Sequence, residues 1–228
     1  MKQDYRYEIK FVLEEADFPV VERWMVERSD CSKSYPDRRV NSIYFDNVNF
    51  SSIRDNLAGV SDRVKNRLRW YGTTCKEVRK SPVLEQKIRN GRLGSKISTP
   101  VPSLKRSVNQ ERQSLILKKI KQSCKYDNYF LTDYFIPTLY VSYSRKYFES
   151  CSGLRVTIDS DILFSRLQPN KSIDNSKKVP YSKKIVEIKF NQSMKEYVSN
   201  LLRDLPLTPR RHSKYLVGMA KFNEVQYF

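Results

Sequence analysis

Three short segments of the chain repeat the pattern glutamate, any residue, lysine inside an apolar frame. They read YEIKF around Glu8, LEQKI around Glu85 and VEIKF around Glu187. Side chains two positions apart lie on the same face of a β-strand, so each glutamate shares a face with its lysine while apolar neighbours take the other face. One such strand is normally a solvated surface strand. Three of them, far apart in sequence, could instead turn their charged faces toward a shared interior.

Further segments continue this alternation. Arg67 and Arg69 share one face, Arg155 shares a face with Asp159, and Arg145 lies in the alternating segment YVSYSRKYF. At least five predicted strands therefore carry a charged face backed by an apolar one. If every charged face were outside, the apolar faces would need a second layer to bury them. A closed barrel with a charged lumen and helices packed outside solves this differently, because the helices cover the apolar faces.

The charge balance predicts an anionic partner. The 228 residues include 43 Lys and Arg against 25 Asp and Glu, a net charge of +18, which suits nucleic acid, an acidic membrane, a nucleotide or polyphosphate. We expect no transmembrane segment and no signal peptide, because there is no apolar run of membrane length and the N-terminus is polar. The single histidine, His212, argues against a histidine-based metal site. The four cysteines lack CxxC spacing, which favours reduced thiols and a cytoplasmic location.

Strands are predicted to dominate, with helices inserted between them. Alternation and turn residues predict strands over 5–13, 40–47, 62–72, 81–92, 138–150, 154–164 and 183–191, helices over 14–28, 50–59, 110–125, 194–205 and 212–222, and polar loops over 92–109 and 165–180. No strict alternation of strand and helix appears. We therefore predict one α+β domain over residues 1–228 with a mostly antiparallel sheet.

The ordered motifs resemble a known family. RYEIKF, SIYFDN, KNRLRWYG, LEQKIR, YSRKYFES, LRVTIDSDI, VEIKF and RHSKYLVGM are similar to segments of the VTC domain, the catalytic domain of polyphosphate polymerases in the CYTH, or triphosphate tunnel metalloenzyme, superfamily. The resemblance runs from residue 6 to 219. It implies an antiparallel closed β-barrel of about eight strands that binds triphosphate with a divalent metal. In this family the enzyme, a transferase, moves the γ-phosphate of ATP onto a growing polyphosphate chain.

The resemblance also implies roles for individual residues. Glu187 matches the metal-binding carboxylate, with Mn²⁺ or Mg²⁺ as the ion, and Glu8 and Glu85 orient cations or assist with the metal. The phosphate contacts and the catalytic work fall to Lys10, Arg67, Arg69, Lys87, Arg145, Arg155 and Lys214, and the further expected substrate contacts are Arg89, Lys189, Arg211 and Ser213. Lys189 has no firm role among them.

Two other functions stay open at this point. The same fold serves triphosphatases, which act on inorganic triphosphate or an RNA 5′ end, and the charge alone would suit a non-catalytic polyphosphate-binding module. Nucleic acid is disfavoured as a partner, because the basic residues alternate on strands and no nucleic-acid motif is visible. The chain has neither the SPX domain nor the membrane helices of eukaryotic members, so we expect a stand-alone enzyme or one with a separate membrane or regulatory partner. Tyr44, Tyr147 and Phe148 are unassigned candidates for stacking on adenine.

Overall fold

The computed structural model describes residues 6–72, 81–91, 93–104, 108–123 and 135–223. Within these ranges nine strands form one antiparallel sheet in the order β1-β9-β7-β6-β2-β3-β4-β5, with β8 paired to β7. The strands are β1 Tyr7–Leu13, β2 Ser32–Asp46, β3 Asp62–Tyr71, β4 Val83–Asn90, β5 Leu93–Pro100, β6 Ile136–Glu149, β7 Arg155–Arg166, β8 Val179–Tyr181 and β9 Lys184–Phe190. The first and last long strands, β1 and β9, are neighbours in the sheet, so both ends of the chain belong to the same structure.

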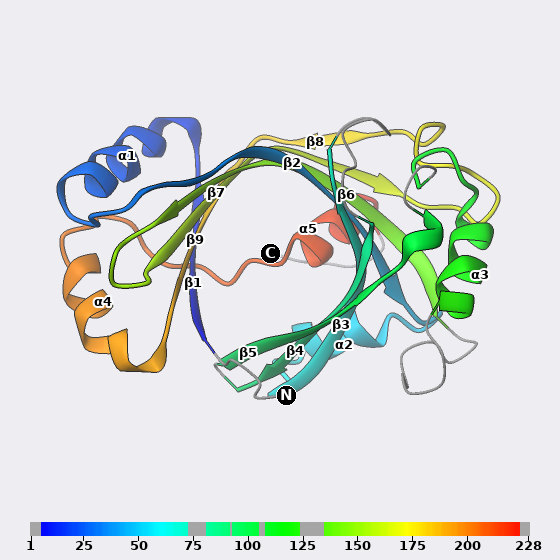
Figure 1. Ribbon diagram of the computed structural model, residues 1–228, viewed down its shortest axis with the longest axis horizontal. Coiled ribbons are helices and arrows are strands. Elements are labelled where there is room, and N and C mark those ends of the chain that lie inside the picture. The colour runs from blue at the N-terminus through cyan, green and yellow to red at the C-terminus, as the bar shows by residue number, and fades with distance from the viewer. Residues whose placement is uncertain (1–5, 73–80, 92, 105–107, 124–134, 224–228) are drawn as a thin grey trace.

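The sheet curves until its two edge strands meet (Figure 1). The contact between β1 and β5 is one bridge, in which the backbones of Arg6 and Gly94 exchange hydrogen bonds of 3.4 and 3.3 Å. Continuous pairing therefore ends at β1 and β5, and the expected closed barrel is not confirmed. Strand twist accounts for this, because two edges that cross at one point diverge on either side of it. We call the two faces of this curved sheet concave and convex.

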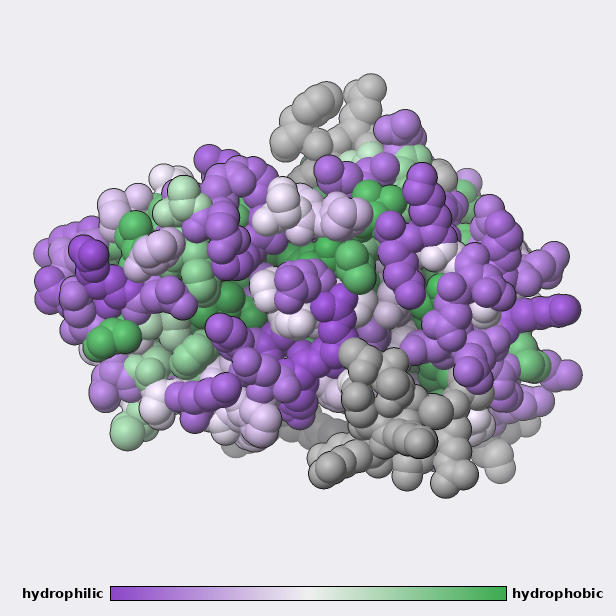
Figure 2. Space-filling view, turned by 90° about the horizontal axis from the view of Figure 1, so that it is seen from above, coloured by the Kyte–Doolittle hydropathy of each residue, from purple (hydrophilic) through white to green (hydrophobic). Residues whose placement is uncertain are grey.

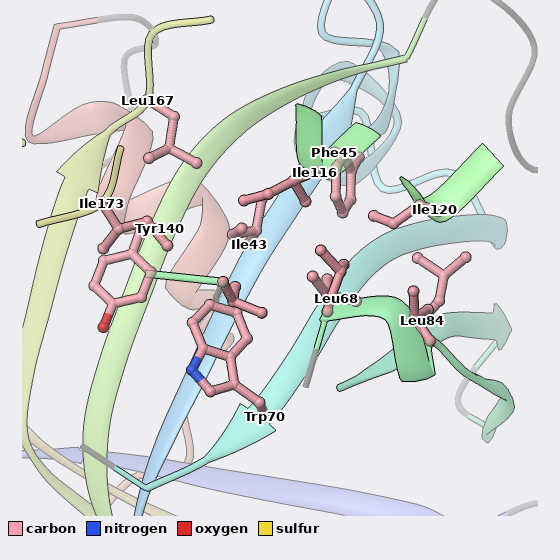
Figure 3. Packing of buried hydrophobic residues seen from close by; sticks show 13 residues of the cluster. Ile43, Phe45, Leu68, Trp70, Leu84, Ile116, Ile120, Tyr140, Leu167 and Ile173 are labelled. Atoms are coloured by element: carbon pink, nitrogen blue, oxygen red, sulfur yellow. The ribbon is translucent and has the colours of Figure 1, made fainter. Parts of the chain in front are cut away.

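Helices cover the apolar convex face. The helical segments are η1 Glu15–Asp17, α1 Phe18–Glu27, α2 Ser51–Leu57, η2 Pro102–Leu104, α3 Gln113–Ser123, η4 Gln192–Met194, α4 Lys195–Leu202 and α5 Lys214–Ala220. Helices α1 and α4 pack on β1, β7 and β9. Helix α3 packs on β2, β3 and β4, where Ile116 and Ile120 lie over Leu68 and Leu84 (Figure 3). Each such side chain that is fully buried contributes about 1.5–3 kcal/mol, so these clusters fix which face of the sheet is left for the charged residues.

Helix α5 lies on the concave face, at one end of it. Tyr215 stacks on Tyr44 of β2 with ring centroids 5.0 Å apart, and Gly218 packs so closely that a Cβ there would lie 2.4 Å from Leu139 of β6. Figure 1 shows α5 within the ring of strands. The helix therefore covers the apolar end of the concave face and leaves the charged part uncovered.

Three predictions about elements were wrong. Residues 93–100, predicted as loop, form β5, which pairs with β4 through the tight turn at Asn90-Gly91, where Gly91 has a φ of +57°. The loop 165–180 is shortened by the end of β7 and by β8, and β2 begins at Ser32 rather than at residue 40. These segments are rich in Ser, Lys and Pro, so their extended state depends on the neighbouring strand rather than on local apolar alternation.

The outer surface is mostly hydrophilic. Figure 2, which looks onto the side that carries β2, β7 and β8, shows hydrophilic residues over most of that face and hydrophobic residues in scattered groups. Among the helices of the described ranges, none has the length and apolar character needed to cross a bilayer. Cys31 and Cys151 are free thiols, whereas Cys75 and Cys124 lie outside the described residues.

Candidate functional site

The strand register places the charged residues of different strands opposite one another. Glu187 of β9 faces Lys10 of β1 across the ladder, and Glu85 of β4 faces Arg67 of β3. Directly opposed residues point to the same side of a sheet. The ammonium of Lys87 on β4 lies 2.9 Å from a carboxylate oxygen of Glu8 on β1, although these strands stand far apart in the sheet order. The three Glu-x-Lys strands thus share one interior, formed by the concave face.

One cluster joins β1 and β9. The Lys10 ammonium lies 2.7 Å from Glu8 and 3.4 Å from Glu187, and Lys189 forms a second ion pair with Glu187. Burial and the proximity of Glu187 raise the pKa of Glu8, but Lys87, Lys10 and Lys189 outweigh them and hold it well below its usual range. The pKa of Glu187 is likewise lowered, because its neighbouring lysines overcome the cost of burial. Both carboxylates are therefore charged at neutral pH.

A second cluster lies on β3, β4 and β5. The Arg67 guanidinium donates to Glu85 over 2.8 Å, Lys96 lies 3.2 Å from the same carboxylate, and Arg69 lies 3.6 Å from it. Burial opposes ionisation of Glu85, but the two arginines and Lys96 hold its pKa well below the usual range. Glu85 thus lies between two arginines of β3 and contacts both of them.

A third cluster joins β6, β7 and α5. Asp159 is fully buried and accepts two hydrogen bonds from Arg145, at 2.5 and 2.7 Å, and one from Lys214, at 2.5 Å. Burial raises the pKa of Asp159, but the two cations outweigh this and lower it to about 2. The carboxylate therefore holds a strand arginine and the first lysine of α5 side by side. Sequence reasoning noted Asp159 on a charged face but gave it no such role.

The structure does not bring every predicted contact into these clusters. Arg155 lies at the β6–β7 hairpin, where its half-exposed side chain donates to Glu149 over 2.8 Å. Arg89 donates to the carbonyl of Gly91 over 2.9 Å at the β4–β5 turn. Arg211 is exposed in the segment before α5. These three lie at the margins of the concave face. Ser213 is the N-cap of α5, where its hydroxyl accepts from the Leu216 N–H.

Lys65 was missed by sequence reasoning. It lies on β3 on the same face as Arg67 and Arg69, and its ammonium donates to Ser213 over 3.0 Å. Within the described residues it has no carboxylate partner. Burial, together with Lys87 and Lys10, lowers its pKa well below the usual value. The segment KNRLR carries the signal, because three basic residues there alternate, but attention to the Arg-x-Arg pair alone left Lys65 out.

A divalent metal fits only part of this donor set. Among the residues that the structure describes, no three or more His, Cys, Asp or Glu side chains lie close enough together to hold a metal ion by themselves. Glu8 and Glu187 form a pair of neighbouring carboxylates, because both contact Lys10 from adjacent strands. A hard cation such as Mg²⁺ is commonly held by one or two carboxylates together with substrate phosphates. The pair therefore fits a metal that arrives with a phosphate ligand.

Solved structures with a similar fold include two proteins assigned as cyclases. A Hippeastrum protein assigned as an adenylyl cyclase, with a dominant triphosphatase activity, is 14% identical, with a TM-score of 0.55 over 95% of this chain and 96% of its own. A Vibrio parahaemolyticus protein assigned as an adenylate cyclase is 8% identical, with a TM-score of 0.51 over 94% and 97%. No curated protein matches the chain by sequence.

The family assignment covers almost the whole chain. Residues 5–223 match the VTC domain. The match includes all the strands that line the concave face, and also α5 with Ser213 and Lys214. The charged interior and the sequence match thus concern the same residues. The chain belongs to the VTC domain family.

Proposed function

We propose that the protein is a metal-dependent ATP–polyphosphate phosphotransferase that works on the concave face of its sheet. The observation that carries this proposal is the convergence of basic side chains from β1, β3, β4, β6 and α5 in a VTC-family chain. The expected substrates are ATP and inorganic polyphosphate. We also propose that residues 1–228 form a single cytoplasmic domain, since β1 and β9 pair and the described thiols are free.

The reaction requires positioning of the reacting groups and neutralisation of phosphate charge, and it needs no covalent intermediate. Phosphoryl transfer is accelerated mainly by holding the groups in line and neutralising charge on the phosphate oxygens. The proposed phosphate contacts are Lys10, Arg67, Arg69, Lys87, Arg145 and Lys214, to which we add Lys65. Glu8, Glu85 and Asp159 hold most of these cations in place before a ligand arrives. Such prior ordering lowers the cost of fixing long side chains at binding.

Glu187, with Glu8 beside it, would hold a divalent cation, Mn²⁺ or Mg²⁺. The ion would supply further neutralisation of phosphate charge. Lys10 contacts both carboxylates, so it would compete with the ion for their oxygens. Lys189 already neutralises one side of Glu187 and keeps that carboxylate ionised.

A triphosphatase is the second candidate, and the position of α5 favours it. The helix covers one end of the concave face, which suits a short substrate better than a chain that must leave at that end. The fold likeness to the Hippeastrum protein with triphosphatase activity points the same way. In this case water takes the place of the polyphosphate acceptor, and the same cations would hold inorganic triphosphate.

The products separate these candidates. We would incubate the purified protein with ATP and Mn²⁺ and analyse the products by gel electrophoresis. A polymerase yields chains that resist nucleases and are degraded by exopolyphosphatase, and Glu187→Gln abolishes them while Glu149→Gln, a change at an exposed pair, does not. Phosphate without chains, from ATP or from tripolyphosphate, would favour the triphosphatase. Tight tripolyphosphate binding with no turnover would contradict both enzymes.

A further inference from the structure

An arginine outside the three clusters is surrounded by tyrosines. The guanidinium carbon of Arg38 on β2 lies 4.7 Å from the ring centre of Tyr147, 4.8 Å from that of Tyr71 and 5.4 Å from that of Tyr35. These residues come from β2, β3 and β6. Tyr35 and Tyr147 also meet edge to face, with centroids 5.9 Å apart. We call these four residues the Arg38 cage.

The Arg38 cage lies on the concave face beside the proposed phosphate contacts. Arg38 stands directly opposite Arg145 in the β2–β6 ladder, and Tyr71 follows Arg69 by two positions on β3. Arg38 lies six positions along β2 from Tyr44, which stacks on α5, and six positions span about 20 Å in an extended strand. The cage therefore borders the charged clusters on the side that α5 leaves uncovered.

Arg38 differs from its charged neighbours in its partners. Arg67 and Arg145 each donate to a carboxylate, whereas no carboxylate in the described part of the chain forms an ion pair with Arg38. Its Nε is buried and has no hydrogen-bond partner among the residues that the structure describes. The contacts of its guanidinium with described residues are cation–π contacts with these aromatic rings. Tyr35 is 54% exposed, so one ring of the cage presents its surface to solvent.

This surface suits a flat aromatic ligand. Nucleobases stack on tyrosine rings and guanidinium planes, and an unpaired guanidinium N–H can donate to a base nitrogen or oxygen. Two other aromatic residues that the sequence offered for stacking on adenine already pack against parts of the protein. Tyr44 is buried against Tyr215, and Phe148 packs into the cluster on the convex face. Tyr147 lies on the concave face opposite Thr157, and it is the one of these three that belongs to the Arg38 cage.

We infer that the Arg38 cage binds the base of the nucleotide whose phosphates lie against Arg145 and Arg69. The base stacks on Tyr35, and Arg38 donates to its edge. This inference rests on the proposed function, because it assigns the nucleoside part of the substrate for the same site. It assigns no role in phosphate binding to the cage, and that separation makes it testable.

The test compares two ligands that share a triphosphate and differ in the nucleoside. We would measure the Kd of ATP and of tripolyphosphate by calorimetry for the wild type, Tyr35→Ala, Tyr35→Phe and Arg38→Gln. Tyr35→Ala and Arg38→Gln are expected to weaken ATP binding about tenfold or more, which is the size of one lost base stack. Tripolyphosphate binding stays within twofold. Tyr35→Phe keeps the ring and keeps ATP affinity. Lys33→Ala, an exposed change on the same strand, is the control.

Several outcomes would overturn the inference. Equal weakening of both ligands would make the Arg38 cage a phosphate site or a folding element, and thermal unfolding of the same variants would separate these two. Unchanged ATP binding in Tyr35→Ala would mean that the cage only joins three strands. A wild type that binds tripolyphosphate but not ATP would overturn this inference and leave the triphosphatase standing, whereas binding of neither ligand would refute the proposed function itself.

Discussion

The Tyr215 hydroxyl donates a 3.0 Å hydrogen bond to the carboxylate of Asp46, which joins α5 to the end of β2. Asp46 is fully buried and also accepts from the backbone N–H groups of Asn47 and Ser52. Thr138 on β6 donates to the same tyrosine oxygen over 3.0 Å. Because Lys214 directly precedes Tyr215, this buried network sets where the first lysine of α5 meets Asp159. The motifs SIYFDN and SKY thus act together.

Removal of the Tyr215 hydroxyl should loosen α5. Tyr215→Phe takes one donor from the buried carboxylate of Asp46, so we expect the free energy of unfolding to fall by about 1.5–3 kcal/mol. Tripolyphosphate affinity should fall as well, because Lys214 loses its fixed position. Urea denaturation and calorimetry measure the two effects. Tyr197→Phe, on the exposed side of α4, is the control, and equal effects of both changes would contradict the role of the network.

We expect the buried amine of Lys65 to lower the stability of the unliganded protein and to strengthen the binding of tripolyphosphate. Its amine lies among Lys10 and Lys87 without a described carboxylate partner. Lys65→Met keeps most of the volume and removes this buried amine, so we expect the unliganded protein to gain about 0.5–2 kcal/mol. Tripolyphosphate affinity should fall about tenfold, or about 1.4 kcal/mol. Lys118→Met on the exposed face of α3 should change neither quantity. A stable variant with unaltered affinity would show that Lys65 does not contact the ligand.

Asp159→Asn should make folding depend on the anion. The change leaves the buried cations Arg145 and Lys214 without their shared carboxylate, which should cost about 3–5 kcal/mol in the unliganded protein. Tripolyphosphate supplies the missing negative charge, so the ligand should raise the melting temperature of this variant more than that of the wild type. Asp161→Asn, an exposed change two residues away, is the control. A melting temperature that the ligand does not restore would place the phosphates elsewhere.

Binding should weaken as the pH rises above about 8. Burial and the nearby Lys10 lower the pKa of Lys87, whereas Glu8 raises it. The net result is a pKa of about 8, against 10.5 for a lysine in the unfolded chain. Between these values the unfolded chain holds a proton that the folded protein lacks, so the free energy of unfolding rises with pH in that window. A polyanion needs the charged form, so its affinity falls over the same window. Calorimetry from pH 7 to 9.5 tests this, and Lys87→Arg should flatten the profile. A flat wild-type profile would contradict it.

The charged strands could be predicted from the sequence, because the alternation that identifies each of them is a local pattern. A period of two tells which side chains of one strand share a face, so the shared faces of Glu85 with Lys87 and of Arg67 with Arg69 follow from it. The partners across the interior were not accessible in this way. Nothing in the sequence pairs Lys87 with Glu8 or Asp46 with Tyr215, since those contacts depend on how far the sheet curves. Arg38 was invisible for the same reason, because its three tyrosines come from three strands and only the packing of those strands brings them together.

The central claim is that phosphates bind on the concave face, among the clusters around Glu187, Glu85 and Asp159. A crystal structure with a nonhydrolysable ATP analogue and Mn²⁺ tests it most directly. The account predicts a triphosphate in contact with Lys10, Arg67, Arg69 and Arg145, and a manganese ion within about 2.5 Å of a Glu187 oxygen, identified by its anomalous signal. Density for the triphosphate on the convex face, or at exposed lysines away from the concave face, would contradict it.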